Sequence, residues 1–574
     1  MTNALSISVG QYSSAGIKAI NQDRCGVFVP EGNEQMTRGI IAAVADGISS
    51  SEVSQEASST VIAGLIEDYY ATPESWSVST AGERVLQSIN AWLYGRSRNS
   101  QYRYDNDSGY ICTLSAIIFK GSKAHLFHAG DSRIYKLVTP ALQQLTTDHL
   151  QADAETGPVL NRAMGLEHQL QCEQRALPVK SGDIFVLATD GVYDFVPAQQ
   201  IAKTINDHSD DLQQASESLV AQALKAGSHD NLTIQIIRLD QVPTESDHRL
   251  QTEATQLPQP PTLSPGMHFE GYELLRELYV SSRSHVFLAK DTASGALVAL
   301  KTLSTDLEED AEAIERFLME DWIARRLDNV HCLKAFDSER PRQSLYSVTE
   351  YIEGQTLTQW MHDNPEPALD EVRRIVEQIG KGLQAMHRKE MIHQDIRPDN
   401  ILIDKSGTVK IIDFGATRIA GLAELGAETE LILGTAQFTA PEYFLGQTGT
   451  PQSDIFSLGV LTYHLLSAEL PYGAGVSKAF STTAQRKLRY QSLIQGERPI
   501  PFWVDDTIRK AVQIQPHKRY QEVAEFIYDL NHPNKAFLNK ARPPLMDRNP
   551  VLFWQCVSLG LLLTLLYQNL PSLN

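Results

Sequence analysis

The sequence predicts a multidomain α+β protein, and three observations support this fold class. The chain has 574 residues, too many for one hydrophobic core, because domains usually hold about 100–200 residues. Short apolar runs mix with helical patterns before residue 240, whereas a strand-rich stretch precedes a largely helical one after residue 267. A proline-rich segment separates these two parts.

The first part, residues 5–240, is expected to be a mixed α and β domain. Its expected strands are short apolar runs, namely Gly39–Ala45, Leu114–Phe119, Ala124–Phe127, Asp183–Ala188 and Leu232–Leu239. Two other segments, Ser54–Tyr69 and Leu212–Ala226, repeat apolar residues at helical spacing.

The second part, residues 267–532, is expected to form another domain. Residues 241–266 lose the apolar periodicity and contain five prolines, which indicates a linker. After it, Tyr272–Leu303 is rich in strand signals and Asp370–Leu530 is largely helical. This order is typical of a small sheet lobe followed by a helical lobe.

The C-terminal segment is apolar and follows a basic one. Residues 533–549 contain four cationic side chains, Lys535, Lys540, Arg542 and Arg548. Val551–Tyr567 is uncharged and lies at the short end of the roughly 17–25 residues that span a bilayer. We therefore expect a transmembrane helix over residues 550–570, with the catalytic domains in the cytoplasm. The alternative is a buried helix that caps the second domain, which Gln555 favours.

The composition excludes several classes of protein. A formal charge of −20 argues against a nucleic-acid partner. The five cysteines include no Cys-x-x-Cys pair, so neither a disulfide framework nor a cysteine zinc site is indicated. A hydrophobic content of 42% with 21% charged residues is ordinary for a globular protein.

Three aspartates of the first domain each stand beside an expected strand. Asp46-Gly47 follows the first of these strands, Thr189-Asp190-Gly191 follows a later one, and Asp230-Asn231 precedes the last. Strand ends can bring such side chains into one cleft, where unneutralised carboxylates repel one another. Hard divalent cations are the usual compensation, although a single Asp-Gly is more often only a turn.

With Asn21-Gln22-Asp23 and Gly130-Asp131-Ser132-Arg133, these motifs resemble the metal-dependent protein phosphatases of the PPM or type 2C family. The resemblance implies a β-sandwich flanked by helices and a two-metal centre of Mn²⁺ or Mg²⁺. The ligands it implies are Asp46, the Gly47 carbonyl, Asp190 and Asp230. It also implies that Asp23 supports the centre through its water shell and that Asp131 helps to hold a third metal.

Two positions of the first domain depart from that family. Lys18 stands where the family commonly places a phosphate-binding arginine, and it supplies a point charge without the bidentate fork. Ser49-Ser50 replaces a glycine pair that often follows the Asp-Gly motif. Neither change removes an expected metal ligand.

The second domain carries a different set of motifs. Lys301 ends an expected strand, and Glu320 lies in the expected helix Glu308–Leu327. Further along the chain come His393-Gln394-Asp395-Ile396-Arg397-Pro398-Asp399-Asn400, Asp413-Phe414-Gly415 and Ala440-Pro441-Glu442. In this order the motifs resemble a eukaryotic-like serine/threonine protein kinase with a bilobal fold.

The kinase resemblance assigns a role to each of these residues. Lys301, paired with Glu320, would hold the phosphates of ATP, and Asp395 would accept the proton of the substrate hydroxyl. Asn400 and Asp413 would hold Mg²⁺, and Arg397 would lie near the γ-phosphate. Glu350 and Ile352 belong to a segment that looks like the hinge meeting the adenine. Asp454 looks like a helix anchor, and Arg519 is expected to pair with Glu442.

One departure is more serious. The three glycines of the phosphate-covering loop are replaced by Tyr279, Ser281 and Ser284. Glycine permits close approach of the backbone to phosphate, so its loss should alter ATP affinity.

The leading hypothesis is a bifunctional enzyme that phosphorylates protein serine and threonine with ATP and removes the same phosphates by metal-dependent hydrolysis. Its expected partners are proteins that carry these residues, including the chain itself. The alternative is an active phosphatase regulated by a nucleotide-binding pseudokinase. An active kinase beside an inactive phosphatase is weaker, because all the expected aspartates are present.

Overall fold

The computed structural model describes residues 5–103, 108–138, 140–153, 157–243, 257–307, 310–337, 340–424, 437–495, 499–534 and 550–568. Its contacts divide the chain into two compact units, mainly residues 1–256 and mainly residues 257–574. Most of the predicted linker and of the basic segment 533–549 lies outside the described residues.

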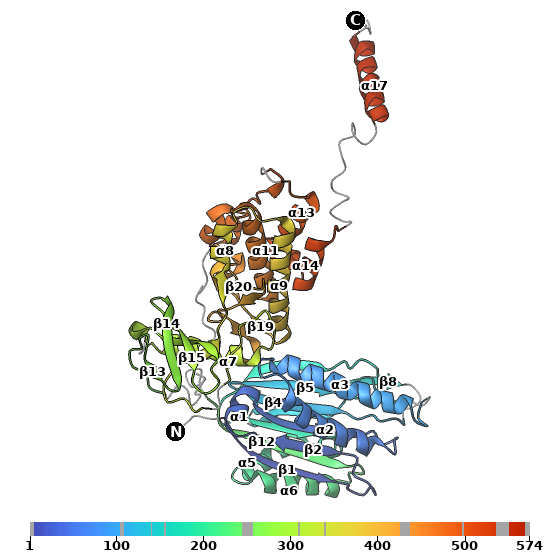
Figure 1. The fold of residues 1–574 in the computed structure, drawn as a ribbon. Coiled ribbons are helices and arrows are strands. Elements are labelled where there is room, and N and C mark those ends of the chain that lie inside the picture. Colours follow the sequence, from blue (N-terminus) through green and yellow to red (C-terminus); the bar gives the residue numbers. More distant parts are fainter. Residues whose placement is uncertain are drawn as a thin grey trace. The chain divides into compact units, whose positions relative to one another are not determined.

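The first unit is built on two antiparallel five-stranded sheets, whose strand orders are β1-β12-β11-β6-β7 and β10-β5-β4-β3-β2 (Figure 1). The strands are β1 (Ser6–Ser14), β2 (Arg24–Phe28), β3 (Ile40–Ala45), β4 (Leu114–Lys120), β5 (Lys123–Ala129), β6 (Arg133–Val138), β7 (Ala141–Gln144), β8 (Leu150–Asp153), β9 (Gly157–Leu160), β10 (Glu173–Pro178), β11 (Ile184–Ala188) and β12 (Leu232–Gln241). The helices of this unit are α1 (Asn33–Arg38), α2 (Ser54–Ala71), α3 (Val78–Arg98), α4 (Asp190–Tyr193), α5 (Ala198–Asp207) and α6 (Leu212–Lys225).

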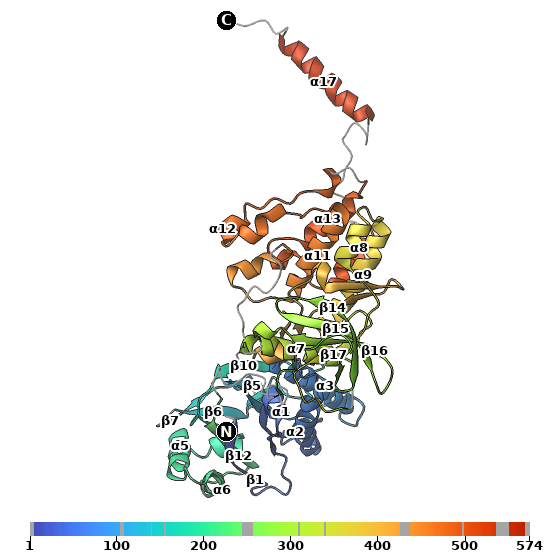
Figure 2. The same cartoon turned by 60° about the vertical axis from the view of Figure 1, so that its left-hand side comes forward.

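The two sheets pack face to face, and helices cover both outer faces. Strand β3 shows why, because every one of its side chains is buried. Alternate residues Ile40, Ala42 and Val44 belong to the core between the sheets, with Phe185 and Ile237 of the other sheet. The opposite face of β3 packs under α2 and α3, and the second sheet packs under α5 and α6. Figure 2 shows these two helix pairs at opposite sides of the unit.

This arrangement confirms the expected β-sandwich flanked by helices. All five expected strands form, and the two expected helices begin at the predicted residues Ser54 and Leu212. Helix α3 was not predicted, although Val85, Ile89 and Leu93 repeat at helical spacing and are buried.

The second unit has a sheet part and a helical part. Its main sheet has the order β13-β14-β15-β16-β17 and is accompanied by α7 (Figure 2). The strands of this half of the chain are β13 (His268–Phe269), β14 (Tyr272–Val280), β15 (Ser284–Asp291), β16 (Leu297–Leu303), β17 (Ser347–Glu350), β18 (Gly354–Thr356), β19 (Met391–Ile392), β20 (Ile401–Asp404), β21 (Val409–Ile411) and β22 (Arg418–Ile419). Its helices are α7 (Ala311–Arg326), α8 (Leu357–Asp363), α9 (Leu369–Arg388), α10 (Ala420–Ala423), α11 (Pro451–Ser467), α12 (Thr482–Gln485), α13 (Phe502–Ala511), α14 (Val523–Asn531) and α17 (Pro550–Gln568).

The helical part is organised around α11, which is buried almost along its length. The carboxylate of Asp454 in this helix accepts hydrogen bonds from the backbone amides of His393 and Gln394, each at 2.9 Å. It thereby anchors the segment that precedes Asp395, as the sequence predicted.

The C-terminal apolar segment forms α17, a helix of 19 residues. Among the helices that the structure describes, none combines the length and the apolarity needed to cross a membrane. At 1.5 Å per residue α17 rises about 28 Å, slightly less than a bilayer core of about 30 Å, and it contains Gln555. The predicted transmembrane helix over residues 550–570 is therefore not supported, and a membrane location stays a prediction.

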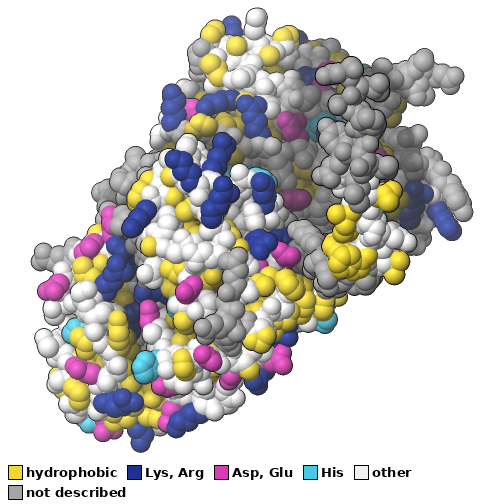
Figure 3. Space-filling view, turned by 90° about the horizontal axis from the view of Figure 1, so that it is seen from above, with side chains coloured by type: hydrophobic (Ala, Val, Ile, Leu, Met, Phe, Trp, Pro, Cys, Tyr) yellow, Lys and Arg dark blue, Asp and Glu magenta, His cyan; other side chains and the backbone are white. Residues whose placement is uncertain are grey.

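The surface bears charges of both signs. On the face shown in Figure 3, lysine and arginine side chains lie among acidic, histidine and apolar ones. The formal net charge of the whole chain is −20.

One buried ion pair fixes the helical part of the second unit. The guanidinium of Arg519 donates to both carboxylate oxygens of Glu442, each at 2.7 Å, and both side chains are at most 3% exposed. The hydroxyl of Ser453 donates to the same carboxylate at 2.6 Å. This pairing was predicted from the sequence.

We expect Glu442→Gln to lower the free energy of unfolding of the second unit by about 3 kcal/mol, because it leaves the buried Arg519 charge uncompensated. Urea unfolding of the full chain measures this loss. Glu353→Gln is the matched control, because Glu353 pairs with Lys405 at the surface and its loss should cost less than about 1 kcal/mol. Equal losses for the two variants would show that the buried pair is not a special constraint.

Candidate active sites

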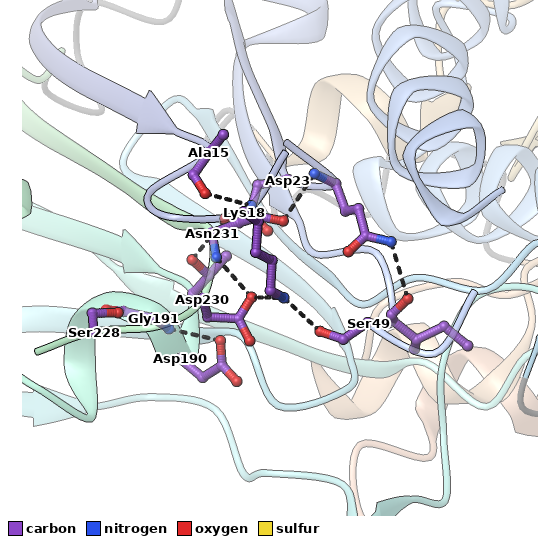
Figure 4. A network of polar contacts seen from close by, with 12 residues as sticks. Ala15, Lys18, Asp23, Ser49, Asp190, Gly191, Ser228, Asp230 and Asn231 are labelled. Atoms are coloured by element: carbon purple, nitrogen blue, oxygen red, sulfur yellow. Dashed lines mark hydrogen bonds and ion pairs between the residues drawn. The ribbon is translucent and has the colours of Figure 1, made fainter. Parts of the chain in front are cut away.

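The aspartates of the first unit meet at one end of the sandwich. Asp46 follows β3 of one sheet, whereas Asp190 follows β11 and Asp230 precedes β12 of the other sheet. Since β11 and β12 are antiparallel neighbours, the end of one adjoins the start of the other. Figure 4 shows the side chains of Asp190 and Asp230 lying close to each other. We call Asp23, Asp46, Asp190 and Asp230 the carboxylate centre.

Three carboxylates of this centre have a raised pKa, those of Asp23, Asp46 and Asp190. Burial raises the pKa of Asp46 well above its usual value, and the charges of Asp23 and Asp190 raise it further. Burial also raises the pKa of Asp190 to about 7, with added repulsion from Asp131 and Asp230. Such mutual repulsion needs positive charge to relieve it.

The surroundings of Asp23 indicate whether a cation fits the carboxylate centre. The side chain of Asp23 is fully buried and accepts one hydrogen bond, from the hydroxyl of Thr189 at 3.0 Å, to its Oδ2 atom. Its Oδ1 atom is buried and has no hydrogen-bond partner among the described residues. A buried carboxylate oxygen without a donor fits a hydrated divalent cation, because such cations take carboxylate oxygens and water as ligands.

The two other predicted members lie beside the centre. Asp131 is half-buried, and its charge is among the causes of the raised pKa values of Asp46 and Asp190. Burial raises the pKa of Asp131 itself to about 6. Gly47 is buried, and a Cβ there would lie 2.8 Å from the Cβ of Ser54, so no larger residue fits.

Sequence reasoning assigned no role to Asn231, which positions the loop beside the centre. Its amide nitrogen donates to the carbonyl oxygens of Ala15 and Ile20, each at 3.0 Å. Its amide oxygen accepts from the backbone amide of Gln22 at 2.9 Å. The three bonds fix the segment that carries Lys18, and the position of Asn231 directly after Asp230 was the available signal.

The second unit brings Lys301 and Glu320 together as predicted. The ammonium of Lys301, on β16, donates to both carboxylate oxygens of Glu320, on α7, at 2.8 and 2.6 Å. Burial favours the neutral form of Asp413 and would raise its pKa. The nearby ammonium of Lys301 outweighs this effect and holds the pKa of Asp413 below its usual value. Asp413 is therefore ionised and suited to a cation.

Asp395 is held by two neighbours in the same loop. The amide nitrogen of Asn400 donates to the backbone oxygen of Asp395 at 2.8 Å and to its carboxylate at 2.9 Å. This leaves the amide oxygen of Asn400 as the atom available to a cation. The guanidinium of Arg397 lies 3.3 Å from the Asp395 carboxylate.

The predicted hinge follows β17. Glu350 is the last residue of this strand, and its carboxylate accepts from the ammonium of Lys410 at 2.6 Å and from the backbone amide of Lys334 at 3.0 Å. Ile352 is half-buried two residues further on. No adenine contact is defined by these observations, so both roles stay predictions.

The turn between β14 and β15 carries the glycine substitutions. The hydroxyl oxygen of Ser281 accepts from the backbone amides of Arg283 and Ser284, at 3.2 and 3.1 Å, and the Ser281 amide donates to the Ser284 carbonyl at 3.0 Å. A serine side chain therefore occupies backbone donors that a glycine-rich loop would offer to phosphate.

Two family models match this chain. The family model for the protein kinase domain matches residues 272–530, and the model for protein phosphatase 2C matches residues 11–226. The kinase range contains all the site residues of the second unit. The phosphatase range contains Asp23, Asp46, Asp131 and Asp190 but ends before Asp230.

Curated relatives match the kinase part. The serine/threonine-protein kinase PrkC of Bacillus subtilis is 30% identical over 259 residues, or 45% of this chain and 40% of that protein. PknB of Mycolicibacterium smegmatis is 33% identical over 271 residues, or 45% of this chain and 42% of that protein. The chain thus spans about two fifths of the length of these relatives.

A solved structure matches the phosphatase part. It is described as the catalytic domain of the serine threonine protein phosphatase PstP in complex with 2 manganese ions. It is 22% identical, has a TM-score of 0.34 and covers 42% of this chain and 100% of its own.

The two family models divide the chain into two domains. The chain is a fusion of an N-terminal protein phosphatase 2C domain with a C-terminal serine/threonine protein kinase domain. Its kinase domain is of the kind found in bacterial PknB and PrkC.

We expect Mn²⁺ to raise the melting temperature of the phosphatase domain more at pH 8 than at pH 6. Folding raises the pKa of Asp190 from 3.8 to about 7, so the metal-free fold loses stability as the pH rises through this range. A metal at 100 times its Kd then restores about 2.7 kcal/mol. Calorimetric melts of the full chain with and without Mn²⁺ measure both values.

The variant Asp190→Asn sharpens this prediction. Without metal it should melt higher than the wild type at pH 8, because one repelling charge is gone, and Mn²⁺ should stabilise it less. Equal Mn²⁺ effects at both pH values would contradict the raised carboxylate pKa.

We expect Ser281→Gly to tighten the binding of Mg²⁺–ATP by at least about fivefold, because it releases two backbone donors, each worth roughly 0.5–1.5 kcal/mol. Fluorescence titration with an ATP analogue measures the Kd whether or not the domain is catalytic. Ser294→Gly is the control, because Ser294 closes the next hairpin in a similar way, through Asp291. Unchanged or weaker binding by Ser281→Gly would refute the explanation.

Proposed function

We propose that the chain is a bifunctional enzyme that transfers phosphate from ATP to protein serine and threonine and removes it again by metal-dependent hydrolysis. This proposal rests on one observation, that the charged residues expected at both sites are all present in one chain. The carboxylate centre keeps its four aspartates, and the kinase cluster keeps the pair of Lys301 with Glu320 beside Asp413.

In the phosphatase domain, Asp46, Asp190 and Asp230, with the carbonyl of Gly47, would hold Mn²⁺ or Mg²⁺. Such ions acidify bound water and stabilise charge on a phosphoryl group. Asp23 and Asp131 would orient water around them. The chain's own contribution is to bring carboxylate oxygens from both sheets to one place.

In the kinase domain, the ammonium of Lys301 would bind the phosphates of ATP, and Glu320 fixes its position. The carboxylate of Asp395 would accept the proton of a substrate hydroxyl, and its hydrogen bond from Asn400 orients it. Asn400 and Asp413 would hold Mg²⁺, and Arg397 would add positive charge near the transferred phosphate. Glu350 and Ile352 would border the adenine.

A second candidate function rests on the Ser281 turn. Because this side chain occupies backbone donors at the tip of the β14–β15 hairpin, the domain could bind nucleotide without transferring phosphate. The chain would then be an active phosphatase regulated by a pseudokinase.

The substrates of both activities would include the chain itself. Fusion raises the concentration of each domain around the other, to the millimolar range for short flexible linkers. A mark that the kinase places on its own chain would then be within reach of the phosphatase.

Labelled ATP tests the two activities together. The wild type, Asp395→Asn and Asp190→Asn are each incubated with labelled ATP and with Mg²⁺ or Mn²⁺, and label on protein is followed with time. We expect more label on Asp190→Asn than on the wild type, because removal is blocked, and none on Asp395→Asn, because its catalytic base is lost. Asp207→Asn, on the exposed end of α5, controls for the loss of one carboxylate.

Other outcomes separate the alternatives. Absence of label on every variant and on a generic protein substrate, with phosphatase activity retained, would favour the pseudokinase. Label that decays equally on the wild type and on Asp190→Asn would refute the phosphatase assignment.

A further inference from the structure

Lys18 lies in a loop that is fixed next to the carboxylate centre. The backbone of this loop is held by the side chain of Asn231, and Gly16 has a φ of +60° at the point of closest approach. A Cβ on Gly16 would lie 2.5 Å from the carbonyl oxygen of Asp230, so the loop and the start of β12 are in close contact. The backbone is thus fixed, whereas the Lys18 side chain is only half-buried.

The ammonium of Lys18 supplies positive charge to the centre. It forms an ion pair with the Oδ1 atom of Asp230 and donates to the hydroxyl of Ser49 at 2.7 Å. Figure 4 shows the Lys18 side chain extending between these two residues. Within the part of the chain that the structure describes, no other lysine, arginine or histidine forms an ion pair with the carboxylate centre.

The bonds to Asp230 leave one of its oxygens unavailable. Its Oδ1 atom accepts from the backbone amide of Asn231 at 2.7 Å as well as from Lys18. An oxygen with two donors has no lone pair left for a cation. A divalent ion on the remaining oxygen would lie within a few ångströms of the ammonium and be repelled by it.

We propose that Lys18 competes with the metal for Asp230 and thereby sets the Mn²⁺ concentration at which the phosphatase domain becomes active. The proposal rests on the proposed function, in which Asp230 is a metal ligand. In the absence of metal the lysine relieves part of the repulsion among the carboxylates. With a metal bound, Asp230 would have the ion as its positive partner in place of the Lys18 ammonium, and the Lys18 side chain would turn away while Ser49 and the loop backbone stay in place.

This exchange predicts that removing the lysine tightens metal binding. Isothermal titration of the full chain with MnCl₂, without nucleotide, measures the Kd of the centre directly. We expect Lys18→Met to bind Mn²⁺ about tenfold more tightly than the wild type, which corresponds to about 1.4 kcal/mol. Lys18→Gln should show the same gain, and Lys18→Arg, which keeps the charge, should stay within about twofold of the wild type.

Two controls isolate the competition from a general effect of charge. Lys180→Met removes the same charge from the exposed turn before β11, at the end of that strand opposite Asp190, and should leave the Kd unchanged. On an Asp230→Asn background, Lys18→Met should change the Kd by less than about twofold, because the group for which lysine and metal compete is absent.

The proposal fails if Lys18→Met and Lys18→Gln bind Mn²⁺ no more tightly than the wild type, or if Lys180→Met shows an equal gain. It also fails if the gain persists in full on the Asp230→Asn background. These readouts do not depend on catalysis. If Lys18→Met binds Mn²⁺ more tightly but the protein hydrolyses no phosphoprotein, the competition between Lys18 and the metal is supported and the proposed phosphatase activity is refuted. If the protein hydrolyses phosphoprotein but Lys18→Met binds Mn²⁺ no more tightly, the phosphatase activity is supported and the competition is refuted.

Discussion

The arrangement of the phosphatase domain depends on the repulsion among its buried carboxylates. The sandwich places Asp46 at a strand end of one sheet and places Asp190 and Asp230 at neighbouring strand ends of the other sheet. Burial raises the pKa of Asp46 and of Asp190. A fold that gathers such groups stays stable only if cations or protons accompany them. The apolar layers under α2, α3, α5 and α6 supply the packing that holds the charges together.

The two domains use a lysine in opposite ways. In the kinase domain, Lys301 is held by Glu320, and its charge keeps Asp413 ionised in the absence of any metal. That site is prepared for a cation. In the phosphatase domain, Lys18 forms an ion pair with Asp230, the residue to which the metal is expected to bind. Under the competition that we propose, a lysine would assist cation binding in one domain and oppose it in the other, because its position relative to the carboxylate differs.

Much of this architecture could be predicted from the sequence. The strand-flanked aspartates, the pairing of Lys301 with Glu320 and that of Arg519 with Glu442 follow from motifs whose residues have fixed roles. The role of Asn231 and the closure of the hairpin by Ser281 could not be predicted, because both depend on which backbone atoms a side chain reaches after folding. The transmembrane helix expected over residues 550–570 is not supported for a different reason, because α17 has 19 residues, near the lower limit for a membrane span, and contains Gln555.

The hydrogen bonds between Asn231 and the loop that carries Lys18 affect how fast the site can respond to metal. Because the backbone around Lys18 is held by three hydrogen bonds, the side chain alone has to move. Rotamer changes of accessible side chains take roughly picoseconds to nanoseconds, whereas loop rearrangements take up to microseconds. If Lys18 and the metal exchange as proposed, the domain would follow a change in free metal without a slow opening step, and the arrival and departure of the ion would set its response time.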